Sequence, residues 1–446
     1  MEICVIDRLN EKGQGRGDRN GKKIDVKGAL VGETVEYTPR CKKRGVTIGS
    51  LTQILNPSLE RVPDRCSHAS VCGGCNFHGW DYNEQLKWKK QQIEKLFSFP
   101  IEEVVPAQNV WYYRNKMEFS FSEDKSKNRY LGLTMEDSRG KVFNQVDCAL
   151  CPEWMLRTRH MVFEFWMTQP DLAAYYLHRN EGSLRTLTCR YSPNTQDRMV
   201  ILGVSGNPQY ALTFDQLQGF KQAILEANND ASNVSIFLVL THIEKGVPTT
   251  TTEMHIHGKD HYEETVLGKR FLVSPQAFFQ PNPSQAEVLY QTGYDFLEPK
   301  TTDHILDLYC GVGSIGICLK DQVATVLGIE LNRYAVCDAK RNIEINQLSN
   351  IDVIVGDVKD VLQHHQNKPF DAVIVDPPRA GLDEKVIEIL GQMRSKKILY
   401  ISCNPKTMSR DVPLLEQKGY RLKRLKGVDQ FAQTTHLEMV GLLEIE

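Results

Sequence analysis

The stretch DLYCGVGSIG, residues 307–316, decides the fold of this chain. It completes an apolar segment typical of a buried strand, HILDLY, and leads into SIGICLK, a segment typical of a helix. Glycines at such a turn let a ligand approach the backbone beside the positively polarised N-terminus of the helix. Gly311, Gly313 and Gly316 satisfy the GxGxxG spacing of dinucleotide-binding turns, and Glu330 ends the next strand 19 residues after Gly311. A cofactor is expected at this turn, and a nicotinamide or flavin enzyme is one interpretation.

From about residue 284 onward, segments typical of strands alternate with segments typical of helices. The strands are HILDLY, TVLGIE, IDVIVGD, DAVIVDPP and KILYISC. The helical segments are SQAEVLYQTGYDFL, SIGICLK, NRYAVCDAKRNIEINQ and DEKVIEILGQM. This alternation predicts a parallel, doubly wound α/β sheet that is covered by helices on both faces. We assign residues 276–446 to this domain.

Acidic residues stand at four successive strand ends of this domain: Asp307, Glu330, Asp357 and Asp376. Such a set suits S-adenosylmethionine, which presents a ribose, an adenine amine and a cationic methionine end. A fourth carboxylate would repel the pyrophosphate of a dinucleotide. The pattern therefore favours methyl transfer over a dinucleotide-dependent oxidoreductase, which remains the alternative.

A cysteine ends the last strand of the series, in ILYISCNPKTMSRD, residues 398–411. Ligand sites open at the carboxyl ends of parallel strands, and Asn404-Pro405 breaks the strand directly after Cys403. A thiol there is a candidate nucleophile, and Lys406 and Arg410 would favour its thiolate if they fold back. The Asp-Pro-Pro motif at Asp376 also suggests an amino-group methylase, but nitrogen methylation does not require a cysteine.

The N-terminal half predicts two further domains. In residues 1–55, short apolar strands alternate with glycine-rich turns, which indicates a small antiparallel barrel. Residues 56–275 read as an α+β middle domain, with a helix near 152–177. A helix that begins after Asp81 opens this region, and part of 84–115 is expected to pack with the C-terminal domain.

Composition places the chain among ordinary globular proteins. The net charge of −2 over 446 residues argues against an indiscriminate nucleic-acid binder, although a basic run, Arg40–Arg44, interrupts the N-terminal part. We find no apolar run long enough to span a bilayer and no secretory leader, so a cytoplasmic protein without membrane contact is expected.

Four cysteines have the spacing of a metal site: Cys66, Cys72, Cys75 and Cys151. Cys151 lies 76 residues after Cys75, and closing that loop costs about 4 kcal/mol of chain entropy. Metal–thiolate sites contribute roughly 10–16 kcal/mol, so a distant fourth ligand is feasible. The chemistry permits zinc, with His68 or His78 as substitute ligands, or an iron–sulfur cluster. Cys148 stands three residues before Cys151 and is interpreted as a bystander.

Five motifs together resemble the RNA uracil-5 methyltransferases. They are SPQAFFQPN, LDLYCGVGSIG, VDPPRAGL, ISCNPKTMSRD and QTTHLEMVGLL, in that family's order along the chain. Residues 1–55 resemble the family's OB-fold-like RNA-binding barrel, the TRAM domain, and YYRNKMEFSF resembles a middle-domain motif. Pro281 and Ala432 depart from the pattern, away from any proposed reacting group. The resemblance implies a Rossmann-like class I methyltransferase domain dependent on S-adenosylmethionine.

The resemblance also implies roles for individual residues. Cys403 matches the nucleophile that adds to uracil C6, and Glu438 matches the base that removes the C5 proton. Asp376 is expected between the cofactor and the base. The positions that match the family's cofactor contacts are Gln280, Tyr309, Ser314, Glu330, Asp357 and Asp376.

The implied substrate is RNA. The family's ribosomal-RNA branch has this cysteine spacing with a final Cys-Pro, so the resemblance implies a [4Fe–4S] cluster on Cys66, Cys72, Cys75 and Cys151. Because the transfer-RNA branch generally lacks the barrel and these cysteines, 23S ribosomal RNA is expected ahead of transfer RNA. No obligate protein partner is expected. A noncatalytic RNA-binding module remains an alternative, against which intact Cys403 and Glu438 argue.

Overall fold

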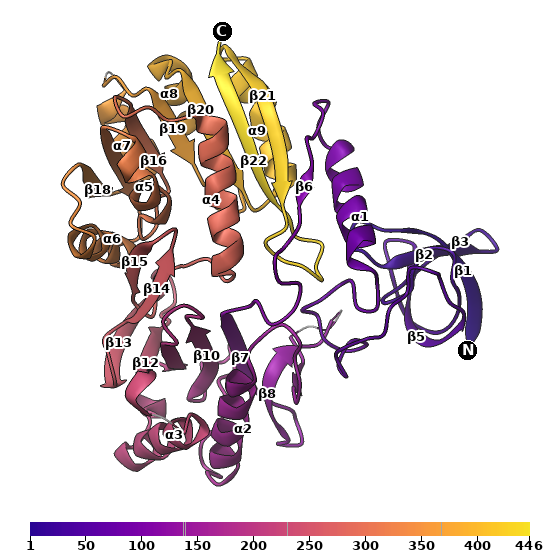
Figure 1. Ribbon diagram of the computed structural model, residues 1–446. Helices are drawn as coiled ribbons and strands as arrows, with labels where there is room; N and C mark the ends of the chain where they lie inside the picture. Colours follow the sequence, from indigo (N-terminus) through magenta and orange to yellow (C-terminus); the bar gives the residue numbers. More distant parts are fainter. Residues whose placement is uncertain (137, 139, 230, 367) are drawn as a thin grey trace.

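The N-terminal residues fold as a closed barrel whose strands are joined in the order β1-β2-β3-β5-β4. They are β1 (Glu2–Leu9), β2 (Gly15–Arg19), β3 (Lys22–Val26), β4 (Thr34–Lys43) and β5 (Val46–Asn56). In the computed structural model, which describes every residue except 137, 139, 230 and 367, this barrel stands at one end of the molecule (Figure 1). The expected barrel is confirmed, but β3 pairs with β5 in parallel. A ring with an odd number of strands cannot close with antiparallel pairs alone.

The middle of the chain forms a seven-stranded sheet in the order β13-β12-β11-β10-β7-β8-β9. Its strands are β7 (Lys116–Glu123), β8 (Arg129–Thr134), β9 (Val142–Asn144), β10 (Leu184–Tyr191), β11 (Arg198–Ser205), β12 (Val234–His242) and β13 (Thr250–His257). Two helices, α2 (Glu153–Met167) and α3 (Phe214–Ala227), cover it with Trp166 and Phe220 in the shared core. The helix expected near 152–177 is shorter in the structure, because Pro170 cannot continue it.

The C-terminal domain is built on an eight-stranded sheet in the order β18-β17-β16-β19-β20-β22-β21-β6. The strands are β6 (Val104–Val105), β16 (His304–Leu308), β17 (Thr325–Glu330), β18 (Ile351–Val355), β19 (Ala372–Val375), β20 (Lys397–Ser402), β21 (Tyr420–Val428) and β22 (Glu438–Ile445). Strands β16 to β20 are parallel, as the sequence predicted. The last strand, β22, is antiparallel and lies between β20 and β21 (Figure 1). Only a short loop joins β21 to β22, and a parallel pair would need a long crossover.

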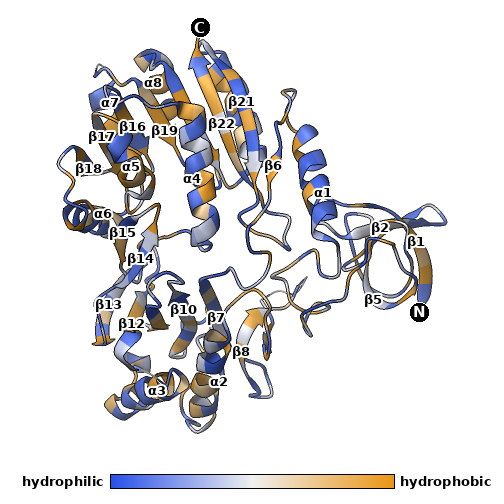
Figure 2. Ribbon diagram, viewed as in Figure 1, coloured by the Kyte–Doolittle hydropathy of each residue, from blue (hydrophilic) through white to orange (hydrophobic). Residues whose placement is uncertain are grey.

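Helices cover both faces of this sheet, which confirms the doubly wound architecture. They are α4 (Pro283–Leu297), α5 (Ser314–Leu319), α6 (Arg333–Ile345), α7 (Val358–His365), α8 (Glu384–Met393) and α9 (Pro405–Glu416). One core contains Leu289 of α4 and Ala335 of α6, and the other contains Leu390 of α8 and Met408 of α9. Figure 2 shows the hydrophobic strands between these helices. A hairpin, β14 (Tyr262–Val266) with β15 (Lys269–Val273), leads into the domain. None of the helices in the described part of the chain is long and apolar enough to cross a membrane.

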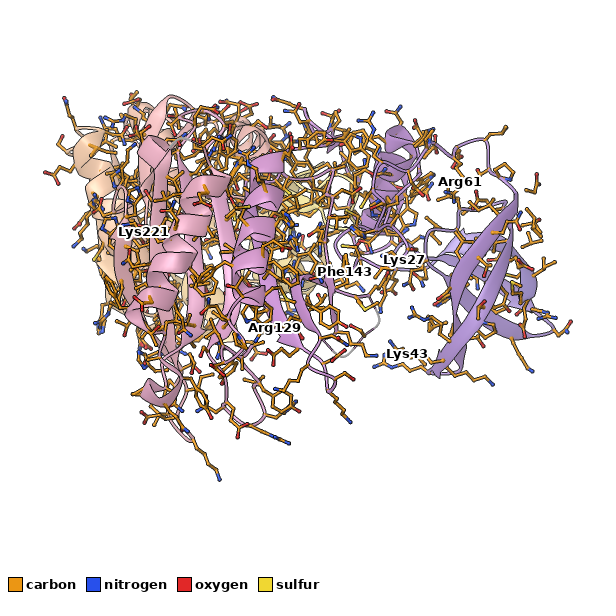
Figure 3. The ribbon with its side chains drawn as sticks, turned by 90° about the horizontal axis from the view of Figure 1, so that it is seen from below. Lys27, Lys43, Arg61, Arg129, Phe143 and Lys221 are labelled. Carbon is orange, nitrogen blue, oxygen red and sulfur yellow. The ribbon has the colours of Figure 1, made fainter. Side chains whose placement is uncertain are left out.

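Ion pairs fasten the barrel to the segment that follows it. Lys27, which directly follows β3, pairs with Glu136 and also donates to the carbonyl of Cys72. Arg61 donates to both oxygens of the buried Glu33 carboxylate, at 2.6 and 2.9 Å. Lys27 and Arg61 lie where the barrel meets the rest of the chain (Figure 3). The barrel is therefore packed beside the cysteine-rich segment and is not connected by a flexible linker alone.

Helix α1 (Tyr82–Glu94) and strand β6 join the C-terminal sheet, although they precede the middle domain in sequence. Strand β6 pairs with β21, and α1 contributes Lys89, whose ammonium lies 2.7 Å from the carboxylate of Asp429. Lys89 is 1 % exposed and Asp429 is fully buried. The Tyr82 hydroxyl donates to the same carboxylate at 2.8 Å, and Lys89 also donates to the carbonyl of Phe431. This network anchors the loop between β21 and β22.

Removing the ammonium at this buried pair is expected to destabilise the protein strongly. Lys89→Met leaves the Asp429 carboxylate buried without its counterion, which costs about 3–5 kcal/mol in the free energy of unfolding. Urea unfolding followed by tryptophan fluorescence measures the change. The matched control is Lys89→Met combined with Asp429→Leu, which removes both charges and should recover most of the loss. A single variant within about 1 kcal/mol of the parent would contradict the role of the pair.

Candidate active site and cysteine cavity

Parallel pairing brings the carboxyl ends of five strands to one edge of the C-terminal sheet. Leu308 of β16 aligns with Ile329 of β17 and with Val375 of β19. Val375 in turn aligns with Tyr400 of β20, which runs on to Ser402. The residues that end or follow these strands therefore lie at the same edge: Tyr309, Glu330, Asp357, Asp376 and Cys403. These are sequence-predicted site residues, and the sheet topology alone gathers them.

The glycine-rich turn after β16 keeps its backbone open to a ligand. Tyr309 and Gly311 adopt positive φ angles of 63° and 56°, and no atom lies within 4 Å of a Cβ built on Gly311. Gly316 donates its N–H to Asp307 at 3.2 Å, and a Cβ at Gly316 would press on that carboxyl group. The other oxygen of Asp307 is buried and has no partner among the described residues. Burial, with the nearby Asp376 charge, raises the pKa of Asp307 to about 8.

Glu330 and Asp357 close the next two strand ends. The Glu330 carboxylate accepts the N–H of Gly311 at 3.1 Å and the N–H of Asn332 at 2.7 Å. It therefore holds the glycine-rich turn in place at the carboxyl edge of the sheet. Asp357 is the N-cap of α7 and accepts the N–H of Lys359 at 3.1 Å. The sequence placed Asp357 at the strand end but did not predict the helix that follows it.

Gln280 and Ser314 reach the same region from other elements. The Ser314 hydroxyl, at the start of α5, lies 2.8 Å from the hydroxyl of Tyr290 in α4. Gln280 is buried, and its side-chain oxygen accepts from Gln430 at 3.3 Å. Gln430 belongs to the loop between β21 and β22, so the segment around Gln280 is tied to the loop that ends at Glu438.

Cys403 follows β20 and directly precedes α9, whose N-cap is Asn404. The Asn404 amide also donates to the carbonyl of Arg379 at 2.9 Å. Burial and the carboxyl groups of Glu438 and Asp376 raise the pKa of the Cys403 thiol, and Arg379 opposes that rise. The thiol is therefore largely protonated in the ligand-free protein at neutral pH.

Glu438 begins β22, next to the end of β20. The antiparallel register aligns Ser402 with Met439, so Glu438 stands opposite the residue that follows Ser402, which is Cys403. Glu438 is 4 % exposed, and burial together with Asp376 raises the pKa of its carboxyl group to about 8. Burial raises the pKa of Asp376 to about 7. A thiol and a carboxyl group of moderate pKa thus lie side by side at this edge.

The cation that acts on this site is Arg379, and the expectation that Lys406 and Arg410 would favour the thiolate is wrong. Lys406 pairs with Glu11 of the barrel, and Arg410 donates to Asp411 at 2.7 Å. Arg410 also donates to the carbonyl of Ala380 at 2.9 Å, so both cations are engaged by other groups. Arg379 belongs to the VDPPRAGL motif, and its position after a strand end was the signal that could have identified it.

A cavity of about 200 Å³ lies between the cysteine-rich segment 66–78 and the middle sheet. Its walls include Cys66, Cys72, Cys75 and Cys148. Cys151 does not line it; this residue is fully buried and contacts Cys148 through its thiol. His78 also lines the cavity, and neither ring nitrogen has a partner among the described residues.

The thiols of this cavity do not form the ligand set of a single metal ion in the part of the chain that the structure describes. Within the described ranges, no three His, Cys, Asp or Glu side chains converge as the ligands of one metal ion would. A mononuclear zinc site needs that convergence. In an iron–sulfur cluster each thiolate binds its own iron, so the sulfur atoms stand farther apart around a hollow. Four free thiols on the wall of one cavity are the type of ligand that an iron–sulfur cluster takes.

Comparisons with known proteins agree on one family. The family model described as tRNA (Uracil-5-)-methyltransferase matches residues 253–446. An uncharacterized RNA methyltransferase of Protochlamydia amoebophila is 40% identical over 95% of this chain and 100% of its own length. Another from Caldanaerobacter subterraneus is 32% identical over 98% of this chain and 97% of its own. The crystal structure of Pyrococcus abyssi tRNA (uracil-54, C5)-methyltransferase in complex with S-adenosyl-L-homocysteine is similar with a TM-score of 0.78, at 26% identity over 99% of both chains.

Proposed function

Because this chain belongs to the S-adenosylmethionine-dependent RNA uracil-5 methyltransferase family, we propose that it methylates C5 of a uridine through a covalent adduct on Cys403. The single observation that carries the proposal is the register between β20 and β22. It sets Glu438 beside Cys403 at the edge where the cofactor-binding turn opens. Uracil C5 is a poor nucleophile. A thiol can activate C5 by adding to C6, and a neighbouring carboxyl group can then remove the C5 proton so that the base is released from the thiol.

Addition of the Cys403 sulfur to uracil C6 is the first step. The thiol first loses its proton to solvent. The sulfur then forms a bond to C6, the C5–C6 double bond opens, and its electron pair moves through C5 toward O4 as an enolate. S-adenosylmethionine supplies a methyl group on a positively charged sulfur. C5 of the adduct bonds to that carbon while the carbon–sulfur bond breaks, so the departing sulfur keeps the electron pair and becomes neutral.

Removal of the C5 proton completes the reaction. The Glu438 carboxylate accepts that proton, the electrons of the C5–H bond re-form the C5–C6 double bond, and the C6–sulfur bond breaks to return the Cys403 thiolate. A carboxyl group with a pKa near 8 holds a proton more firmly than an exposed one, which suits it to this transfer. Asp376, whose charge acts on both Glu438 and Cys403, is proposed to lie between the cofactor and this pair.

The residues at the strand edge fit the proposed cofactor. The strand edge offers an acidic, hydrogen-bonding surface. It is made by the Asp307 oxygen that has no partner among the described residues, the open backbone at Gly311 and the partly exposed carboxylate of Glu330. We propose that six side chains hold S-adenosylmethionine: Gln280, Tyr309, Ser314, Glu330, Asp357 and Asp376.

Binding of the cationic cofactor is expected to release protons. At neutral pH, the carboxyl groups of Asp307, Asp376 and Glu438, with pKa values of about 8, 7 and 8, are wholly or partly protonated. A nearby positive charge favours their ionised forms and lowers each pKa, so affinity should rise from pH 6 to about pH 8 and then level off.

Calorimetry at pH 7 in two buffers with different ionisation enthalpies measures the released protons, on the order of one per site. S-adenosylhomocysteine is the matched control, because it has the same groups without the sulfonium charge. It should release fewer protons and depend less on pH. Equal proton release by the two ligands would contradict the placement of the sulfonium near these carboxyl groups.

Two RNA classes are candidate substrates. Ribosomal RNA is proposed first on the spacing of Cys66, Cys72, Cys75 and Cys151. Transfer RNA is the second candidate, because the archaeal neighbour is named a tRNA methyltransferase and matches 99% of this chain. That match extends through the N-terminal barrel, so the barrel does not separate the two classes.

The test is methylation of unmodified RNA by the purified protein. Transcribed 23S ribosomal RNA and a pool of transfer RNA are incubated separately with methyl-labelled S-adenosylmethionine and digested to nucleosides. We expect label in 5-methyluridine from 23S RNA. Label in transfer RNA alone would overturn the substrate class and retain the chemistry, and label in another nucleoside would overturn the chemistry.

A [4Fe–4S] cluster is proposed for the cysteine cavity. Its ligands are Cys66, Cys72 and Cys75, with a fourth thiolate from the segment 148–151, where the sequence predicts Cys151. Such a cluster would join the ends of a long loop and stabilise the junction between barrel and middle sheet. Methyl transfer needs no redox centre, so its proposed role is structural or in RNA docking.

A further inference from the structure

One residue in the loop between β21 and β22 has a backbone conformation that its side chain disfavours. Gln433 adopts a φ of 68°, in the left-handed region that residues other than glycine rarely occupy. It is buried and precedes Glu438 in the same loop. Strained backbone of this kind persists only where neighbouring groups hold it, and it is most common at functional sites. The groups that hold Gln433 are therefore candidates for a role in the reaction.

Gln85 of α1 binds Gln433 through both the backbone and the side chain. The N–H of Gln433 donates to the side-chain oxygen of Gln85 at 3.2 Å, and the Gln85 amide donates to the side-chain oxygen of Gln433 at 3.1 Å. The same amide donates to the carbonyl of Trp80 at 2.9 Å. Gln85 is fully buried, and hydrogen bonds in such a low-dielectric setting are strong. One side chain thus holds the strained residue at two points.

The carbonyl of Gln433 is held separately, by the cysteine-rich segment. It accepts the backbone N–H of Asn76 at 2.9 Å and that of Phe77 at 3.2 Å. The Asn76 side-chain oxygen accepts the N–H of Thr435 at 3.3 Å, and its amide donates to the carbonyl of Lys12 in the barrel at 3.2 Å. The carbonyl therefore stays anchored when the bonds from α1 are removed. A substitution on α1 then tests the φ angle of Gln433 without releasing the whole loop.

The conformation of Gln433 bears directly on the position of Glu438. Four residues separate the two, and the hydroxyl of the first, Thr434, donates to the carbonyl of Phe431 at 2.8 Å. The last of the four, Leu437, is buried in the core of the C-terminal domain. Because this short segment is fixed near both ends, a change of φ at Gln433 must be absorbed by the residues that lead into β22. Such a change moves the carboxyl group that lies beside the thiol.

We propose that Gln85 is a positioning residue for the reaction: it holds Gln433 in the left-handed conformation and thereby places Glu438 beside Cys403. The inference rests on the proposed function, in which Glu438 removes the C5 proton. Addition to C6 and methyl transfer come before that step and do not need Glu438. Loss of the hold should therefore slow the release of methylated RNA more than it slows methyl transfer.

Gln85→Met tests the proposal, because methionine is an unbranched side chain of similar length that makes none of these hydrogen bonds. Methyl-labelled S-adenosylmethionine and the RNA that the parent methylates are used under single-turnover and steady-state conditions. We expect single-turnover methyl transfer within about threefold of the parent, steady-state turnover lower by about 10- to 100-fold, and a methylated protein–RNA adduct on denaturing gels. Gln91→Met makes the same change at an exposed position of α1 and should match the parent.

Gln433→Gly supplies a rescue that separates positioning from folding. Glycine adopts a positive φ without strain, and its introduction also removes the side-chain oxygen that Gln85→Met would leave buried and unpaired. Added to Gln85→Met, it should restore steady-state turnover to within about fivefold of the parent and remove the adduct. Alone, it should stay within about threefold of the parent, because the carbonyl at position 433 keeps its bonds to Asn76 and Phe77.

Parental kinetics in Gln85→Met would overturn the proposal. An equal fall in both rates without an adduct would also overturn it, since a loss of folded protein has that effect. A double variant as slow as Gln85→Met would show that the side chain does not act through the backbone of Gln433. Calorimetric binding of S-adenosylmethionine measures the folded fraction, and Gln85→Ala replaces Gln85→Met if the latter does not fold. A parent that forms no 5-methyluridine would refute the proposed function, and the inference with it.

Discussion

Cys403→Ala is expected to abolish methylation while S-adenosylmethionine binding stays within about twofold of the parent. Without addition at C6 no enolate forms, so C5 remains too poor a nucleophile to attack the methyl group. Loss of a nucleophile of this kind reduces turnover by factors on the order of 10⁴ or more. The smaller side chain leaves the glycine turn and Glu330 untouched, so the cofactor site should persist. Single-turnover transfer of labelled methyl groups to RNA measures the first effect, and calorimetry measures the second.

The matched control is Cys337→Ser, which also removes one thiol from the C-terminal domain but lies exposed on α6, away from the strand edge. It should retain the parental rate. A Cys403→Ala protein that methylates RNA within about tenfold of the parent would end the nucleophile role of Cys403.

Glu438→Gln is expected to trap the enzyme on its RNA after the methyl group has moved. Glutamine keeps the shape of the side chain but cannot accept the C5 proton, so the C6–sulfur bond cannot break. In the cofactor-bound state, where Glu438 is expected to be ionised, the change also removes a charge that raises the pKa of Cys403, which makes the thiolate easier to form. Both effects favour the adduct, and turnover should fall by about 10²–10⁴-fold, the usual contribution of a general base.

Denaturing gel electrophoresis with labelled RNA and labelled methyl donor detects the trapped species, which should carry both labels. Glu444→Gln is the control, because it makes the same change on β22 but at the far end of the strand. It should turn over normally and leave no adduct. A Glu438→Gln enzyme that binds RNA only noncovalently, or that turns over normally, would assign proton removal to another group.

The sequence predicted the positions of the candidate residues best where they lie at strand ends. Asp307, Glu330 and Asp376 follow apolar runs, and the carboxyl ends of parallel strands must meet at one edge. Their proximity is therefore a consequence of topology and needs no knowledge of side-chain packing. The closed N-terminal barrel was predictable for a similar reason, since short strands with glycine turns have few stable arrangements.

The misses concern contacts between segments far apart in the sequence. The direction of β22 depends on how a short loop returns to the sheet, and no local pattern in Glu438–Ile445 shows it. Lys406 pairs with Glu11, a residue of the barrel, which removes it from the thiol. Cys148 lies on the cavity wall, where its neighbour Asp147 accepts a hydrogen bond from Ser67 in the loop of Cys66. Each outcome depends on a tertiary partner that periodicity and spacing do not encode.

The most direct test of the central claim uses RNA that contains 5-fluorouridine together with S-adenosylmethionine. Fluorine at C5 cannot leave as a proton does, so a reaction that passes through a C6 adduct must stop after methyl transfer with the protein bound to the base. We predict a stable, methylated protein–RNA species whose modified peptide, identified by mass spectrometry after digestion, carries the nucleotide on Cys403. A methylated product without any protein linkage, or a linkage to a different residue, would contradict the mechanism.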